Sequence, residues 1–123
     1  MTTKVTLGPT GQATVGSADI AANRLVCLDA NGLLIVCPSG SRPIGSVQDA
    51  FKIGTLATYY KCQGQTHLVG TSGTVVKGDL IKTYTGGLAL ADVASGSTAL
   101  SVNTIGQLVT DPDTDGNADA VLF

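Results

Sequence analysis

The chain has 123 residues, enough for one domain that buries a core without disulfides or metals. Only 13% of the residues are charged, and the net charge is −2, with the seven Lys and Arg residues scattered along the chain. This pattern lacks the basic patch that binds nucleic acid or an anionic membrane surface, so neither is expected as a partner. The longest apolar stretch, Leu33–Cys37, is too short to span a bilayer, and Met1–Lys4 leads into polar sequence unlike a signal peptide.

The composition favours β-structure. The chain has no Glu and no Trp, whereas Gly, Thr, Ser and Val are abundant, as in strands and tight turns. With 43% hydrophobic residues and few charges, much of the surface must be uncharged or covered. We therefore expect an all-β fold, a small β-barrel or β-sandwich, with low charge of the kind common in proteins that belong to an assembly.

Residues 1–17 are predicted to form an extended N-terminal arm, followed by a single β domain over residues 18–123. Val5 and Leu7 share one side of the arm if it is a strand. Such an arm can pair with a sheet edge of its own chain or of a neighbour, or it can fray.

The first predicted hairpin spans residues 24–37 and is apolar on both faces. If Asn31-Gly32 is a two-residue turn, the two faces carry Val26, Leu28, Leu33 and Ile35 on one side and Leu25, Cys27, Leu34 and Val36 on the other. A half-solvated strand would alternate with polar residues, so both faces must be covered by another sheet, by the arm or by another subunit.

The three cysteines are Cys27, Cys37 and Cys62, and they contain no CxxC pair. In the register just described Val26 faces Cys37, while Cys27 lies on the opposite face, so a bridge between Cys27 and Cys37 is not expected. Their odd number also argues against a closed disulfide framework. We expect buried free thiols in a protein that folds in a reducing cytoplasm.

Further strands follow at short intervals. They are predicted at residues 44–48, 56–63, 66–69, 79–91 as a second hairpin, 104–110 and 118–123, with a helical turn possible at 89–94. The second hairpin repeats the first at an offset of 55 residues, and both following strands repeat at an offset of 61. This hairpin-plus-strand duplication, with a longer loop near 92–103 in the second copy, predicts a rigid β scaffold rather than a catalytic fold.

One loop has the composition of a calcium site. Asp111, Asp113, Asp115 and Asp119 alternate with other residues around Gly116, and hard cations need several oxygens. However, Leu122 stands where an EF-hand carries its Glu, and surface turns use the same residue types, so a metal here is a minor alternative and no cofactor is expected.

Catalytic signals are weak. His67 is the single histidine, no GxSxG or P-loop motif occurs, and the polar residues are too few for an obvious acid and base pair. We therefore do not expect an enzyme. Tyr59 and Tyr60 would point to opposite faces of a strand, which leaves a small calcium-dependent carbohydrate-binding module as an alternative.

The order of the motifs carries a resemblance. Lys77-Gly78-Asp79-Leu80 is followed by Gly86-Gly87-Leu88, and the Ile-Gly pair occurs in two strands, at Ile44-Gly45 and Ile105-Gly106. Over residues 13–123 this order resembles the capsid decoration, or cement, proteins of tailed bacteriophages. The polar loop Asp111–Asn117 departs from that pattern.

The resemblance implies a structural virion protein that assembles as a homotrimer in the host cytoplasm. It would bind the outside of the expanded head at three-fold and quasi-three-fold positions and bridge subunits of the major capsid protein. We predict capsid contact through Lys4, Val5 and Leu7, and subunit contact through Leu25, Leu34 and Val36. A tail or baseplate structural protein is the alternative within the same class.

Overall fold

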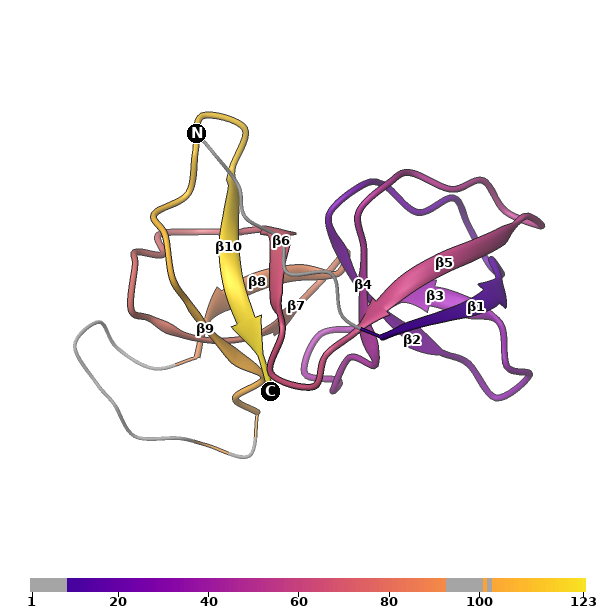
Figure 1. Ribbon diagram of the computed structural model, residues 1–123, viewed down its shortest axis with the longest axis horizontal. Helices are drawn as coiled ribbons and strands as arrows, with labels where there is room; N and C mark the ends of the chain where they lie inside the picture. The colour runs from indigo at the N-terminus through magenta and orange to yellow at the C-terminus, as the bar shows by residue number, and fades with distance from the viewer. Residues whose placement is uncertain (1–8, 93–100, 102) are drawn as a thin grey trace.

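The computed structural model describes residues 9–92, 101 and 103–123, which form two five-stranded antiparallel sheets (Figure 1). The first sheet contains β1 (Thr10–Thr14), β2 (Arg24–Leu28), β3 (Leu34–Val36), β4 (Gly45–Val47) and β5 (Leu56–Lys61). The second contains β6 (Thr66–Gly70), β7 (Leu80–Tyr84), β8 (Leu88–Ala91), β9 (Gly106–Leu108) and β10 (Asn117–Leu122). Within the part of the chain described, no helix has the length and apolar character needed to cross a membrane.

The two sheets have the same topology. The strand order is β1-β5-β4-β2-β3 in the first sheet and β6-β10-β9-β7-β8 in the second, so each strand of one sheet has a counterpart five strands later. We call β1–β5 the first half and β6–β10 the second half; Figure 1 shows them side by side, joined where β5 leads into β6. The all-β fold and its internal duplication are confirmed.

Each sheet curls until its first strand approaches its last. A parallel bridge between Val15 and Leu34 joins the chain after β1 to β3, and a parallel bridge between Thr71 and Ala89 joins the chain after β6 to β8. Because the two bridges lie at equivalent positions, both halves approach the closed geometry of a small barrel, which reduces the length of exposed sheet edge.

The repeated Ile-Gly pair has a steric cause. A Cβ atom added to Gly45 would lie 2.1 Å from the Tyr60 carbonyl oxygen, and one added to Gly106 would lie 2.3 Å from the Val121 carbonyl oxygen. Each glycine therefore permits two neighbouring strands to approach more closely than any side chain would allow. The two halves use the same device at the same place in β4 and β9.

The buried apolar side chains form two clusters. The first lies inside the first half, around Val15, Ile20, Val26, Leu34, Val47, Ala57 and Tyr59. The second fills the second half and also includes Leu25, Cys37 and Cys62 from the first half. The halves therefore share part of their core, because one face of the first hairpin packs into the second cluster.

The predicted register of the first hairpin is wrong by one residue. Asp29 pairs with Leu33 through a hydrogen bond of 2.9 Å from the Asp29 amide, which leaves a three-residue loop instead of two. In that loop Gly32 has a φ of 77°, as expected for a type I turn followed by a left-handed residue. Leu28 therefore lies opposite Leu34, and every side chain after the turn moves to the other face.

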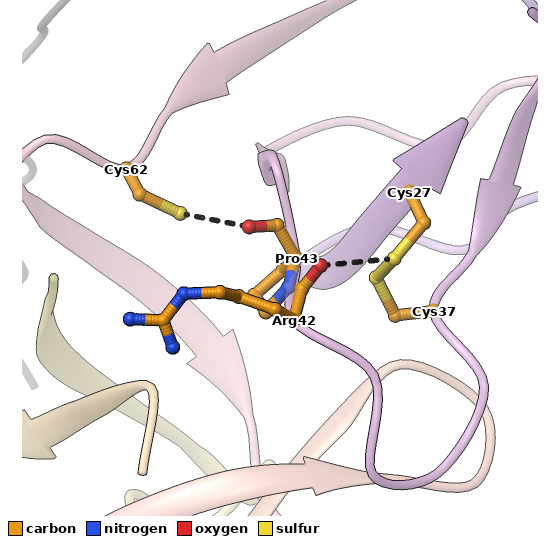
Figure 2. The surroundings of a disulfide bond; sticks show 5 residues. All are labelled: Cys27, Cys37, Arg42, Pro43 and Cys62. Carbon is orange, nitrogen blue, oxygen red and sulfur yellow. Dashed lines mark hydrogen bonds between the residues drawn. A yellow bond between two sulfur atoms is a disulfide. The ribbon is translucent and has the colours of Figure 1, made fainter. Parts of the chain in front are cut away.

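This register places two cysteines together. Cys27 lies opposite Ile35, and Cys37 is two residues beyond Ile35 on the same face. The two cysteines form a disulfide with their Cα atoms 5.0 Å apart (Figure 2). The prediction of free thiols at these positions is wrong, whereas Cys62 is a buried free thiol.

Two other segments differ in part from expectation. Thr10–Thr14, within the segment predicted to be an arm, form β1, which pairs with β5 of its own sheet. The helical turn predicted at residues 89–94 is wrong for Ala89–Ala91, which belong to β8 and pair with β7. Residues 93 and 94, and most of the predicted long loop near 92–103, lie outside the described residues.

Candidate functional site at the seam between the halves

The two halves meet along a seam, which we define as the contact of β2 with β6 and β8. Two backbone hydrogen bonds of 2.8 Å cross it: the Leu25 amide donates to the Gly87 carbonyl, and the Gly70 amide donates to the Asn23 carbonyl. The second half of the same chain therefore covers the face of the β2–β3 hairpin that carries Leu25 and Cys37.

Glycines make this close approach possible. A Cβ atom on Gly87 would lie 2.6 Å from the Leu25 carbonyl oxygen, and Gly87 also has a φ of 74°. A Cβ atom on Gly70 would lie 2.6 Å from the Arg24 guanidinium and 2.8 Å from Leu88. The Gly86-Gly87 turn is thus required by the seam as well as by its own backbone conformation.

The loop before β4 adds further contacts across the seam. Arg42 donates from Nη1 to the Thr104 carbonyl at 3.3 Å, and the Gly40 amide donates to the Thr83 carbonyl at 3.0 Å. Figure 2 shows Arg42 and Pro43 between the disulfide and Cys62. This loop therefore connects the first hairpin to β7 and to the chain before β9.

Cys62 has no exposed reactive group. Its thiol donates to the Pro43 carbonyl at 3.6 Å (Figure 2). Burial raises the pKa of Cys62 to about 11, against the opposing effect of the Arg42 charge. The thiol is therefore protonated at neutral pH, and it behaves as a small apolar group within the shared core.

A buried polar pair also crosses the seam. Ser46 Oγ of β4 lies 2.6 Å from His67 Nδ1 of β6, and both residues are 0% exposed. Gln48 donates from Nε2 to Ser46 Oγ at 2.9 Å, so the serine hydroxyl is free to donate its proton to the imidazole. When the hydroxyl donates to Nδ1, His67 is neutral and carries its proton on Nε2.

The environment of His67 favours that neutral form. Burial lowers the pKa of His67, and the backbone carbonyls of Cys62 and Lys61 oppose this effect only in part. Because solvent does not reach either Ser46 or His67, the pair lacks the access that a nucleophile and its base need. It acts as a polar cross-link between the halves.

An apolar groove of about 520 Å³, which we call the end groove, opens where β5 leads into β6. It is lined by Leu28, Ile44, Tyr59, Lys61, Cys62, Gln63 and Phe123. Ile44 and Tyr59 also belong to the first-half core, so the groove is an open end of that core. Leu28 and Phe123 are 44% and 47% exposed, so two large apolar side chains contact solvent at the groove.

The predicted subunit-contact residues need correction. Leu25 and Leu34 are both 0% exposed within the single chain, so neither presents a surface to another subunit. They also lie on opposite faces of the hairpin, because of the one-residue shift in register. Val36 is half-buried against the first-half core. The predicted capsid-contact residues Lys4, Val5 and Leu7 lie outside the described residues.

The predicted calcium loop has a different organisation. Asp113 Oδ1 accepts hydrogen bonds from the Asp115 and Asn117 amides at 2.9 and 3.0 Å, and Asp111 Oδ1 accepts one from the Lys77 amide at 2.8 Å. Asp119 is 4% exposed inside β10, whereas Asp115 is exposed. Within the described ranges no three His, Cys, Asp or Glu side chains gather as a metal site would require.

The predicted tyrosine platform is only partly accessible. Tyr59 is 9% exposed in the first-half core, and Tyr60 is half-buried on the other face of β5.

Sequence reasoning missed the seam network of Ser46, Gln48 and His67, since no local pattern reveals how the segments that carry these residues pack together. The Gly86-Gly87 pair was the one available signal of the seam.

Comparison with known proteins shows a likeness at the level of the fold. No family model matches the chain, and no curated protein matches it. Among solved structures, it is similar to the crystal structure of the head fiber gp8.5 N base of bacteriophage phi29, with a TM-score of 0.73. The match covers 94% of this chain and 93% of that chain at 14% sequence identity, so the two share a fold over nearly their whole lengths.

Proposed function

We propose that this protein is a structural component of a bacteriophage virion that decorates the outside of the head. The observation that carries the proposal is the fold, which is similar over nearly the full chain to the base of a phage head fiber. The order of its sequence motifs, which resembles that of capsid decoration proteins, supports the same assignment independently of the fold.

The finer proposal is a homotrimer that bridges subunits of the major capsid protein at three-fold and quasi-three-fold positions of the expanded shell. Three linked contacts make the second and third engagements intramolecular, so weak single contacts give strong overall binding. A lattice that places its contact points at the right spacing is then stabilised over one that does not, through the difference in affinity.

Exposed apolar side chains indicate which surface is available for such contacts. Leu56 and Ile53, at the connection between β4 and β5, are 61% and 54% exposed. Their counterparts in the second half, 61 residues later, are the polar residues Asn117 and Thr114. The second half closes the corresponding turn with an equivalent bond, from the Gly116 amide to the Asp113 carbonyl, without apolar side chains there, so the fold does not require Leu56 and Ile53. We infer that they contact the capsid.

The test uses purified protein and expanded empty shells. Light scattering is expected to give the mass of a trimer, and co-sedimentation is expected to give saturable binding to the shells. Leu56→Asp should weaken shell binding at least tenfold, because it places a charge in an apolar contact. The matched variant Asn117→Asp, at the equivalent position, should bind as the unmodified protein does.

Two results would contradict the proposal. A protein that remains monomeric and does not sediment with expanded shells is not a decoration protein of this kind. Binding to purified tails in place of shells would assign the protein to the tail. If Leu56→Asp binds shells as well as Asn117→Asp does, decoration stands but the capsid contact lies on another surface.

A further inference from the structure

The disulfide is an addition to a hairpin that the chain also builds without one. The β2–β3 and β7–β8 hairpins pair in the same register. The counterparts of Cys27 and Cys37, 55 residues later, are Lys82 and Asp92. The second half therefore has two polar side chains where the first has a bridge, so the backbone of the hairpin does not depend on the bridge.

The surroundings of the bridge also suit a pair of thiols. The Cys27 sulfur lies 3.5 Å from the Arg42 carbonyl oxygen. The next carbonyl along the chain, that of Pro43, accepts a hydrogen bond from the protonated thiol of Cys62 (Figure 2). After reduction the Cys27 thiol has an equivalent acceptor in place, and Cys37 lies in the second-half core, where a thiol packs as a small apolar group.

The two sulfurs of the bridge differ in their access to solvent. Cys27 is half-buried at the margin of the second-half core, whereas Cys37 is 0% exposed. Thiol–disulfide exchange requires a thiolate to reach the sulfur that it attacks. A reagent in solution therefore enters at Cys27, and Cys37 is the leaving thiol.

We propose that Cys27 and Cys37 form a redox-sensitive clamp, which opens and closes within the folded protein and, when closed, holds residues 38–43 against the second half. Closure uses a low-molecular-weight disulfide as the oxidant. The Cys27 thiolate attacks this disulfide and releases one reagent thiol, and the Cys37 thiolate then attacks the Cys27 sulfur of the mixed disulfide and releases the second. The protein loses two electrons and two protons, and the reagent is reduced to two thiols.

The third cysteine does not compete for the bridge in the folded protein. Burial raises the pKa of Cys62 to about 11, so its thiol is a poor nucleophile at neutral pH. Arg42 and Pro43 also lie between Cys62 and the bridge (Figure 2). Closure in the folded state therefore has a single product.

The clamp acts on the seam through the loop that follows it. Cys37 directly precedes residues 38–43, in which the Gly40 amide donates to the Thr83 carbonyl at 3.0 Å and the Arg42 guanidinium donates to a carbonyl just before β9. Both acceptors belong to the second half. Because the bridge fixes the start of this loop to β2, opening the bridge gives the loop more freedom to leave the seam. The inference does not rest on the proposed function.

The first test follows one redox cycle of the full chain without denaturant. Dithiothreitol should open the bridge while the circular dichroism spectrum stays native, and oxidised glutathione should then restore the bridge between Cys27 and Cys37. Mass spectrometry of peptides after alkylation identifies the partners. Loss of the native spectrum on reduction, a bridge that opens only in urea, or a new bridge that includes Cys62 would overturn the proposal.

A matched pair of variants tests the point of entry. Under native conditions with oxidised glutathione, Cys37→Ser should carry glutathione on Cys27, whereas Cys27→Ser should leave Cys37 unmodified. The reduced, unmodified protein gives the same comparison without a substitution, since brief alkylation should label Cys27 at least about tenfold faster than Cys37. Equal labelling of the two cysteines would overturn entry at Cys27.

Hydrogen exchange measures the hold on the loop. Reduction should speed exchange at the Gly40 amide by about threefold or more, because the loop leaves the seam more often. The control is the Asp92 amide, which bonds to the Leu80 carbonyl in the hairpin that has no bridge, and its exchange should stay unchanged. Equal exchange at Gly40 in the oxidised and reduced proteins would overturn the action of the clamp on the seam.

Discussion

The two halves of the molecule share a backbone but fill it differently. In the first half the Cys37 amide donates to the Leu25 carbonyl at 3.0 Å, and in the second half the Asp92 amide donates to the Leu80 carbonyl at 2.8 Å. Cys37 forms a disulfide, whereas its counterpart Asp92 accepts a hydrogen bond from Ser101. The comparison teaches that main-chain pairing defines this fold, and that side chains at equivalent positions are free to stabilise it by different means.

The interior of each half also contains a pair of facing residues, one large and one small, at equivalent positions. In the first half Gly11 of β1 lies opposite Tyr59 of β5, and in the second half His67 of β6 lies opposite Ala120 of β10. The large side chain has exchanged strands with the small one. A Cβ atom on Gly11 would lie 2.4 Å from the Tyr59 ring, so the small partner is required. The total volume at this position is what matters for the core.

The largest expected effect tests the shared backbone. Gly45→Ala and Gly106→Ala should each lower the free energy of unfolding by about 3 kcal/mol, because the new Cβ would overlap a carbonyl oxygen of the adjacent strand. Urea denaturation followed by circular dichroism measures both. Similar losses in the two variants would support equivalent roles in the two halves.

A glycine in an open turn supplies the control. Gly116 has a φ of 81° and open space around its Cβ position. Gly116→Ala should therefore cost only about 1 kcal/mol, from backbone strain without a clash. If Gly45→Ala costs no more than Gly116→Ala, the close approach of β4 and β5 is not what requires glycine.

The next effect concerns the disulfide, which the second half lacks. The double variant Cys27→Ser, Cys37→Ser should lose about 2 kcal/mol of stability under oxidising conditions, since a bridge that closes a short loop restricts the unfolded chain. Dithiothreitol should lower the stability of the unmodified protein to that of the variant and leave the variant unchanged.

Thiol titration checks the pairing directly. Denatured, unreduced protein should expose a single thiol, from Cys62, and reduction should expose all three cysteines. Three reactive thiols without reduction would contradict the bridge. In the native state Cys62 should react slowly, because burial raises its pKa to about 11 and keeps the thiol protonated.

A smaller effect concerns the polar cross-link at the seam. Burial lowers the pKa of His67 below its ordinary value of 6.5, so the unfolded chain binds a proton more readily than the folded protein does. Stability from neutral His67 is fully present above about pH 6.5 and is lost as the pH falls below that value. Urea denaturation at pH 7.5 and 5.5 should show this loss.

His67→Gln is the control for this dependence. Its amide does not titrate, so the stability of the variant should change little between the two pH values, although the variant is less stable at pH 7.5. A loss at pH 5.5 that equals that of the unmodified protein would assign the dependence to other groups.

The strands and the duplication could be predicted because short sequence patterns indicate each of them. The Ile-Gly pairs at Gly45 and Gly106 and the repeated hairpins marked equivalent places in the two halves. The register of the first hairpin could not be predicted, because Asn31-Gly32 fits a two-residue turn as well as a three-residue one. That single shift moved Cys37 to the face of Cys27, so the predicted free thiols form a disulfide instead. The predicted surface at Leu25 was wrong for another reason, because the second half covers that face of the hairpin.

The candidate site was less accessible to sequence reasoning. Ser46 and His67 lie 21 residues apart on strands of different sheets, and their contact depends on how the halves pack. The end groove likewise combines Leu28 of β2 with Phe123, which lies far from it in the sequence. Such combinations arise from tertiary packing, for which a single sequence gives no local signal.

The smallest expected effect compares two Asp turns that share a local geometry but lie at different places in the two halves, between β2 and β3 and between β9 and β10. Asp29 Oδ1 accepts hydrogen bonds from the Asn31 and Leu33 amides at 2.8 and 3.0 Å, and Asp113 makes the matching bonds in the second half. Asp29→Ala and Asp113→Ala should each cost about 1 kcal/mol, through loss of these bonds to exposed amides. Urea denaturation with and without calcium measures both. Because Asp113 Oδ1 already accepts both bonds of its turn, calcium should change neither result. A rise in stability with calcium that Asp113→Ala abolishes would show that Asp113 contributes to a metal site.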